Sequence, residues 1–150
     1  MNCRIGTKQD IPIMCRIRKQ QLIDEGINPE SNIDQELFTF FEKKMSDGSL
    51  VEWLLEENEK IVATAAILFM EFPPTFTNPS GVKGYITNMF THPDYRGKGI
   101  ASAMLGKLTD EARKRGVKHI WLLSSNPGKP VYGHFGFIQT DKYMELNLDP

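Results

Sequence analysis

The stretch from Gly84 to Gly116 has the sequence GYITNMFTHPDYRGKGIASAMLGKLTDEARKRG. Residues 84–91 are rich in aromatic and β-branched side chains, which predicts a strand. Residues 99–115 place apolar side chains at helical spacing, and Gly116 is a common residue just beyond a helix end. A second apolar strand is predicted at 119–123. Since a strand, a helix and a further strand form a crossover unit, we expect its two strands to be parallel.

The same patterns extend outward from this unit over the rest of the chain. Two apolar runs joined by a short polar connection predict a hairpin, and three prolines exclude residues 72–81 from any central strand. The predicted strands and helices follow one another without a linker or a repeat, which favours a single domain over residues 1–150. Their order is typical of the α/β or α+β class, with helices on both faces of the sheet. The further predicted elements are strands at 3–5, 50–55, 61–72 and 143–148 and helices at 10–26, 34–47 and 130–135.

The composition is that of an ordinary globular domain and excludes several kinds of protein. The chain has 150 residues, and its net charge of −1 disfavours a nucleic-acid binder. No apolar run approaches the ~20 residues of a membrane span, and we expect no membrane partner. Cys3 and Cys15 lack the spacing of a zinc site or a redox motif, so we expect no metal and a reducing, cytoplasmic location.

The glycines of the segment Arg96-Gly97-Lys98-Gly99 indicate a binding site for phosphate groups. The first turn of a helix leaves backbone N–H groups without partners and carries a partial positive charge. Glycines let a ligand approach the bare backbone, and the two cations add full charges. A P-loop would need a GxxxxGK segment followed by Ser or Thr, and a dinucleotide fingerprint would need Gly or Ala at Ser102; the chain has neither.

The segment Arg96-Gly97-Lys98-Gly99-Ile100-Ala101 matches the pattern Arg/Gln-x-x-Gly-x-Gly/Ala at a strand-to-helix junction. It follows Thr91-His92-Pro93-Asp94-Tyr95, and a Tyr-x-x-x-Gly-Phe segment comes later, at Tyr132 to Phe137. These two motifs, at this separation, resemble the GCN5-related N-acetyltransferase (GNAT) family. The resemblance implies a mixed, mostly antiparallel sheet in which the strands at 84–91 and 119–123 form a parallel pair.

The resemblance also implies the co-substrate acetyl-coenzyme A (acetyl-CoA) and the residues that hold it. The pyrophosphate would lie on the N–H groups around Gly97 to Ser102, and the pantetheine arm along the backbone of Met89 and Thr91. Tyr132 takes the place of the family tyrosine that hydrogen-bonds the thiolate leaving group. The implied binding residues are Met89, Phe90, Thr91, Arg96, Gly97, Lys98, Gly99, Ile100, Ala101, Ser102, Asn126 and Tyr132. In place of the family asparagine seven residues before the tyrosine, this chain has Ser125, with Asn126 one position later, so either side chain is a candidate.

Acyl transfer to an amine needs a proton acceptor. An alkyl ammonium with a pKa near ~10.4 costs about 4.6 kcal/mol to deprotonate at pH 7. Glu71, where the strand at 61–72 meets the proline-rich loop, is the predicted general base, and His92 and His134 are alternatives that titrate in the useful range.

The predicted function is therefore an acetyl-CoA-dependent N-acetyltransferase, in which a primary amine attacks the acetyl group directly in a ternary complex. The alternative is a non-catalytic acyl-CoA sensor that retains the glycine loop. The acceptor, a small molecule or a peptide, is left open. The acidic residues would either attract a cationic amine or peptide or simply form a solvated face; they are Asp24, Glu25, Glu30, Asp34 and Glu36. A homodimer is a further expectation.

Overall fold

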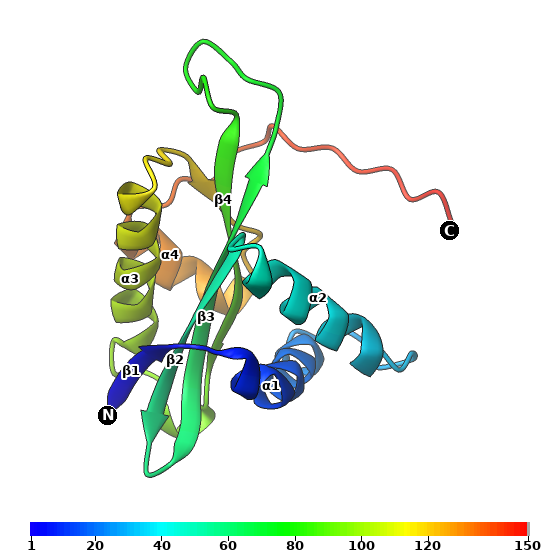
Figure 1. Cartoon of the computed structure of the whole chain (residues 1–150), viewed down its shortest axis with the longest axis vertical. Helices are drawn as coiled ribbons and strands as arrows, with labels where there is room; N and C mark the ends of the chain where they lie inside the picture. The colour runs from blue at the N-terminus through cyan, green and yellow to red at the C-terminus, as the bar shows by residue number, and fades with distance from the viewer. Residues whose placement is uncertain (150) are drawn as a thin grey trace.

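The computed structural model describes residues 1–149, and its centre is a five-stranded sheet (Figure 1). The strand order is β1-β2-β3-β4-β5, so each strand pairs with its sequence neighbour. All pairs are antiparallel except β4–β5, which is parallel and confirms the predicted crossover. The strands are β1 (Asn2–Ile5), β2 (Leu50–Glu57), β3 (Lys60–Glu71), β4 (Val82–Thr91) and β5 (Ile120–Trp121).

Helices cover both faces of the sheet, as predicted. In Figure 1, α3 and α4 lie on one side and α1 and α2 on the other. The helices are α1 (Ile11–Asp24), α2 (Asp34–Ser46), α3 (Ile100–Lys114) and α4 (Lys129–Phe135), with short 3₁₀ turns η1 (Lys8–Asp10), η2 (Pro93–Tyr95) and η3 (Asn126–Gly128).

The sheet separates two apolar cores. On the α3 side, Met104, Leu105 and Leu108 are almost fully buried against β2, β3 and β4. On the other side, Met14 of α1 and Phe41 of α2 pack on the opposite face of the sheet. Burial of the apolar stripe of each helix is what fixes these layers, since removing apolar surface from water is the main favourable term in folding.

The antiparallel hairpins follow from local backbone preferences. Asn58 and Glu59 connect β2 to β3 with φ angles of 50° and 64°, the left-handed pair that two-residue hairpins require. The predicted hairpin is thus confirmed. The proline-rich loop 72–81 joins β3 to β4 and projects from the end of the hairpin in Figure 1.

A β-bulge interrupts the pairing of β3 with β4. Thr64 pairs with Phe90 and Ala66 pairs with Thr87, so Ala65 lies opposite two residues, Asn88 and Met89. Asn88 has a φ of 54°, a conformation that Asn tolerates better than most side chains. Bulges of this kind redirect side chains and backbone groups next to functional sites.

Two strand predictions need correction. The strand predicted at 119–123 is confined to Ile120 and Trp121, and no strand forms at 143–148. The C-terminal segment lies open to solvent: Met144, Leu146 and Leu148 are 93%, 84% and 88% exposed. The strand prediction is wrong here because no neighbouring strand in the described residues completes the hydrogen bonds that a strand needs.

Among the helices of the described residues, none has both the length and the apolar character needed to cross a membrane.

Candidate active site

A cavity of about 640 Å³ lies where the end of β4, the start of α3, α4 and the end of α1 meet. Most of the residues predicted to bind the co-substrate line it. They are Met89, Phe90, Thr91, Arg96, Gly97, Gly99, Ile100, Ala101, Ser102, Asn126 and Tyr132. The structure therefore brings the glycine loop and the tyrosine motif, which are more than thirty residues apart in the chain, to one site.

The glycine loop forms the floor of this cavity at the start of α3. Gly97 and Gly99 have φ angles of 76° and 77°, which a β-branched side chain does not adopt without strain. Gly99 is the N-cap of α3, so the N–H groups of the first turn point out of the helix end toward the cavity. This end of α3, with its partial positive charge, suits a phosphate group.

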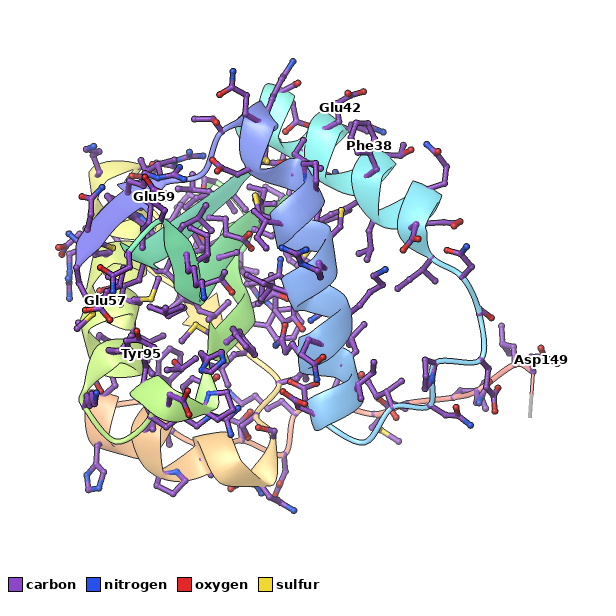
Figure 2. All side chains as sticks on the ribbon, turned by 90° about the horizontal axis from the view of Figure 1, so that it is seen from below. Phe38, Glu42, Glu57, Glu59, Tyr95 and Asp149 are labelled. Carbon is purple, nitrogen blue, oxygen red and sulfur yellow. The ribbon has the colours of Figure 1, made fainter. Side chains whose placement is uncertain are left out.

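The turn before the glycine loop is held by its own contacts. The Nδ1 atom of His92 accepts a hydrogen bond from the Asp94 N–H (3.2 Å), and Nε of Arg96 donates to the Thr91 carbonyl (3.0 Å). Tyr95 hydrogen-bonds the Glu57 carboxylate, which raises the pKa of the phenol; both residues lie on the same edge of the molecule in Figure 2. These contacts order the turn, and His92 is not among the residues that line the cavity.

The wall formed by β4 begins at the bulge. Since Asn88 and Met89 have no paired residue on β3, their backbone departs from the regular ladder just before the strand reaches the glycine loop. Met89, Phe90 and Thr91 then line the cavity. β4 pairs with β5 only at Gly84 and Tyr85, so the side of β4 that faces β5 is open from Met89 to Thr91 and can offer backbone N–H and C=O groups to an extended ligand.

Tyr132 closes the cavity from α4. Burial raises the pKa of its phenol, with smaller contributions from Glu25 and Tyr85, so the hydroxyl carries its proton at neutral pH. The ring packs edge-on against Phe137, with the centroids 5.9 Å apart. A Cβ atom on Gly128 would lie 2.8 Å from the Tyr132 ring, so the glycine allows this close approach.

The end of α1 supplies the polar side of the cavity. Gln21, Asp24 and Glu25 line it, and an Oδ atom of Asp24 lies 3.9 Å from the Arg96 guanidinium. Asp24 and Glu25 were noted in the sequence as acidic residues, whereas Gln21 was missed. Gln21 is only 8% exposed. A polar residue at a buried position of the helix was the signal that could have pointed to it.

Two predicted site residues do not line the cavity. Lys98 lies with its ammonium 5.2 Å from the centroid of the Tyr95 ring. Glu71 is exposed at the end of β3, paired with Val82 at the start of β4. At ~3.3 Å per residue, that position is about 30 Å along β4 from Thr91. Ser125 and Asn126 both line the cavity, so the structure brings both pantetheine candidates to the site.

Three features are together typical of an acyltransferase that uses coenzyme A. They are the sheet order, the parallel β4–β5 pair and a glycine loop that faces a tyrosine. Residues 16–137 match the model of the acetyltransferase (GNAT) family. The protein therefore belongs to the acetyltransferase (GNAT) family, and the resemblance seen in the motifs is confirmed.

Solved structures extend this similarity over the whole chain. A protein from Clostridium acetobutylicum, described as a predicted acetyltransferase and crystallised with acetyl-CoA, is 52% identical, with a TM-score of 0.96 over 98% of this chain and 96% of that one. A GCN5-related N-acetyltransferase from Ralstonia eutropha JMP134 is 24% identical, with a TM-score of 0.89 over 97% of each chain. The second similarity concerns the fold alone.

A curated relative is similar over a shorter stretch. The glucosamine 6-phosphate N-acetyltransferase of Trypanosoma brucei brucei is 30% identical over 89 residues. This alignment covers 59% of the present chain and 58% of that enzyme.

Metal ligands are not part of the site as described. Within residues 1–149, no group of three or more His, Cys, Asp or Glu side chains is placed to hold a metal ion.

Proposed function

We propose that the protein transfers an acetyl group from acetyl-CoA to a primary amine. The observation that carries this proposal is the single cavity that joins the start of α3 to Tyr132 and to the acidic end of α1. The start of α3 suits a pyrophosphate, Tyr132 suits a sulfur leaving group, and the acidic end of α1 suits a cationic amine. The glycine loop fits this co-substrate because Gly97 and Gly99 leave open space where a side chain would otherwise stand.

Acetyl-CoA supplies an activated acetyl group on a thioester. In our proposal the free N–H groups at the start of α3, with Arg96, hold the pyrophosphate, and either Ser125 or Asn126 contacts the pantetheine. The β4 backbone at Met89 directs an N–H donor toward the carbonyl oxygen on which negative charge develops. Such a preorganised donor acts at the transition state without reorganisation.

Tyr132 is proposed to hydrogen-bond the departing sulfur. A phenol with a pKa near ~10 is a weaker acid than a thiol near ~8.5, so full proton transfer to the thiolate is uphill by roughly 2 kcal/mol. The ammonium formed when the amine attacks is a far stronger acid and is the better final source of the proton. Burial of Tyr132 keeps the hydroxyl protonated and available as a donor.

The general base stays a prediction. Glu71 was proposed from its position in the chain, but its exposed place at the far end of β4 gives it no contact with the cavity. Asp24 and Glu25 are the carboxylates that do line the cavity, and either can accept a proton directly or through water. Glu25→Gln and Glu71→Gln distinguish the Glu25 carboxylate from the Glu71 carboxylate.

The acceptor is proposed to be a small-molecule or peptide amine that enters beside α1. The name of the trypanosomal relative makes glucosamine 6-phosphate one compound to test. Asp24 and Glu25 favour acceptors that arrive as cations, since opposite charges attract over several ångströms at a partly desolvated surface.

An acceptor screen tests the proposal directly. The protein is mixed with acetyl-CoA and pooled amines (amino sugars, polyamines, amino acids, peptides), and free thiol is followed with a chromogenic reagent. We expect thiol release with at least one pool. If acetyl-CoA binds by calorimetry but no pool releases thiol, the non-catalytic sensor becomes the better reading.

We further propose that the protein works in the cytoplasm, without nucleic-acid or membrane partners, as a homodimer. The free thiols of Cys3 and Cys15 support a reducing compartment. We propose that residues 1–150 form a single domain, which the one sheet in the described residues supports.

A further inference from the structure

Arg18 places a positive charge on the face of α1 that packs against the sheet. Ile11, Met14 and Cys15 form the buried stripe of this helix, and Arg18 follows them at helical spacing, so it lies on the same stripe. Its side chain is partly buried, and Nη1 donates a hydrogen bond of 3.1 Å to Oε1 of Gln21. Within residues 1–149 it forms no ion pair. A cation that is partly removed from water is stabilised by an anion, so this position suits an anionic ligand.

Glu52 does not neutralise the Arg18 charge at neutral pH. Burial raises the pKa of the Glu52 carboxyl to about 8, although the Asn88 amide and the Arg18 charge oppose the shift. At pH 7 the carboxyl therefore keeps its proton in most molecules. On the other side, Gln21 accepts from Arg18 and donates from Nε2 to Oε1 of Glu25 at 3.3 Å. A cation and a carboxylate thus lie at the two ends of Gln21, which lines the cavity.

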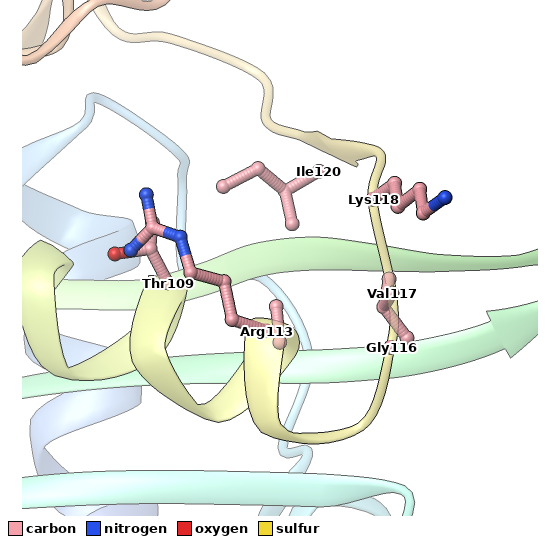
Figure 3. A pocket seen from close by; sticks show the side chains of 7 residues that line it. Thr109, Arg113, Gly116, Val117, Lys118 and Ile120 are labelled. Carbon is pink, nitrogen blue, oxygen red and sulfur yellow. The ribbon is translucent and has the colours of Figure 1, made fainter.

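Tyr85 and Trp121 lie on the same face of the sheet as α1. Tyr85 pairs with Leu68, which packs against the core that α1 covers. Side chains alternate along a strand, and Ile120 points to the α3 face, where it lines a separate hollow of about 420 Å³ (Figure 3). Trp121 therefore points to the α1 face, and its ring centroid lies 4.5 Å from that of Tyr85.

Together with the Arg18 guanidinium, these two side chains give this face three hydrogen-bond donors. The indole N–H of Trp121 is buried and has no partner in the described residues. Burial raises the pKa of the Tyr85 phenol and the Arg18 charge lowers it in part, so the hydroxyl keeps its proton at neutral pH and can donate. Burial, Glu25 and Tyr85 in turn raise the pKa of Tyr132, so the donors border the end of the cavity where the sulfur would lie. Donors gathered around a guanidinium suit a carboxylate or a phosphate, whose oxygens accept.

We propose that Arg18 and Tyr85 bind a carboxylate or phosphate group of the acceptor, with the acceptor amine beside Glu25. The acceptor is then an amine that also carries an anionic group, such as an amino acid or a phosphorylated amino sugar. The guanidinium fork of Arg18 matches two oxygens of either group. Gln21, bonded to both Arg18 and Glu25, sets the spacing between the two charges. Because the subsite rests on the proposed acetyl transfer, it narrows the acceptor of that reaction.

Initial rates with matched acceptors test the subsite. In each pair only one member carries the anion: amino acids against their amides for a carboxylate, and glucosamine 6-phosphate against glucosamine for a phosphate. We expect wild-type kcat/KM to be at least roughly tenfold higher for the anionic member of one pair, which identifies the anion. Arg18→Gln should remove this preference through KM, with little change in kcat. Arg18→Lys keeps the charge but not the fork and should retain part of the preference.

Arg16→Gln is the matched control, because Arg16 is exposed on the same helix, and it should keep the wild-type preference. Calorimetry with acetyl-CoA checks the fold of Arg18→Gln, and its Kd should match that of wild type. The subsite is overturned if wild type uses both members of every pair equally or favours the members without the anion. It is also overturned if Arg18→Gln slows both members of a pair to the same extent.

The absence of thiol release with every acceptor would instead contradict the proposed reaction. Calorimetric titration of the same pairs onto the coenzyme A complex then decides the subsite by itself. Tighter binding of an anionic member to wild type than to Arg18→Gln would support it, and equal binding to the two proteins would overturn it.

Discussion

The Asn88 side-chain amide donates a hydrogen bond of 2.8 Å to Oε1 of Glu52 across the width of a strand. Glu52 lies on β2 and Asn88 on β4, and β3 runs between them. Ala66 is the β3 residue paired with Glu52. Its side chain is small, so the side chains of Glu52 and Asn88 can meet above it. The Asn88 carbonyl also accepts a bond of 2.7 Å from the Thr64 hydroxyl. These bonds fix the bulge from which Met89 enters the cavity.

Glu52 should make stability depend on pH. Burial raises its pKa from the ordinary 4.5 to about 8, so the folded protein keeps a proton that the unfolded chain releases above about 4.5. Between these pH values unfolding releases the proton, and raising the pH therefore lowers the free energy of unfolding. We expect a loss of a few kcal/mol from pH 4.5 to 8, at ~1.36 kcal/mol per pKa unit.

Urea unfolding of wild type and Glu52→Gln at pH 5 and pH 8 measures this loss. The amide keeps the acceptor for Asn88 but does not titrate, so the difference between the two pH values should shrink. Glu42→Gln, on the exposed face of α2, is the matched control and should behave as wild type (Figure 2). An unchanged pH dependence in Glu52→Gln would show that another group carries it.

Asn88→Ala should lower kcat more than it lowers affinity for coenzyme A. It leaves Glu52 without its donor and places an alanine at a positive φ, which together cost about 1–3 kcal/mol. Coenzyme A binding depends on the glycine loop and should change little. Asn88→Gly removes the same hydrogen bond, but glycine adopts a positive φ without strain. Its kcat and its free energy of unfolding should therefore fall less than those of Asn88→Ala.

Gly99→Val should weaken acetyl-CoA binding strongly. A β-branched side chain at a φ of 77° distorts the first turn of α3 and covers the N–H groups, so we expect Kd by calorimetry to rise at least roughly tenfold. Gly116→Val is the control, because Gly116 has a φ of 72° just beyond the other end of the same helix. It should lose similar stability and keep its affinity; unchanged binding in Gly99→Val would remove the glycine loop from the site.

Tyr132→Phe should lower kcat about 10- to 100-fold with little change in KM for acetyl-CoA, because it removes a donor used only as the thiolate forms. Stopped-flow thiol release with a good acceptor measures the effect. Burial raises the pKa of this phenol, so the wild-type rate should hold as pH rises through the ordinary titration of tyrosine. Tyr143→Phe, outside the cavity, should retain full activity.

Glu25→Gln should raise KM for a cationic acceptor several-fold, whereas Glu71→Gln should leave kcat and KM unchanged. The reason is position: Glu25 lines the cavity, and Glu71 is exposed at the opposite end of β4. Initial rates with one cationic and one neutral amine separate charge attraction from base catalysis. A tenfold loss of kcat in Glu71→Gln would restore Glu71 as the general base.

The donor side of the site was predictable because its signal is local. Arg96 to Ala101 is one continuous segment, and Tyr132 lies in a second motif, so the resemblance of these two motifs to the GNAT family was enough to indicate their shared use. The proposed acceptor side was not predictable, since Gln21, Asp24 and Glu25 come to the cavity only through the packing of α1 on the sheet. Glu71 illustrates the limit: residues adjacent to a loop in sequence can lie a whole strand length from the chemistry.

The fold followed from periodicity except at its edge. The crossover unit, the hairpins and both helical layers depend on contacts within the chain. The spacing of apolar residues in the sequence therefore predicts them. The segment 143–148 has the pattern of a strand, yet a strand forms only where another backbone supplies its hydrogen bonds. Sequence pattern identifies such a segment but says nothing about which backbone completes it.

The sheet that separates two cores also divides the work of the enzyme. α3, on one core, brings the glycine loop, while α1, packed on the other, brings Gln21, Asp24 and Glu25. Because helices from different cores build the two sides of the cavity, we expect substitutions along α1, away from the Asp24–Arg96 contact, to change the preferred amine while the glycine loop still binds acetyl-CoA.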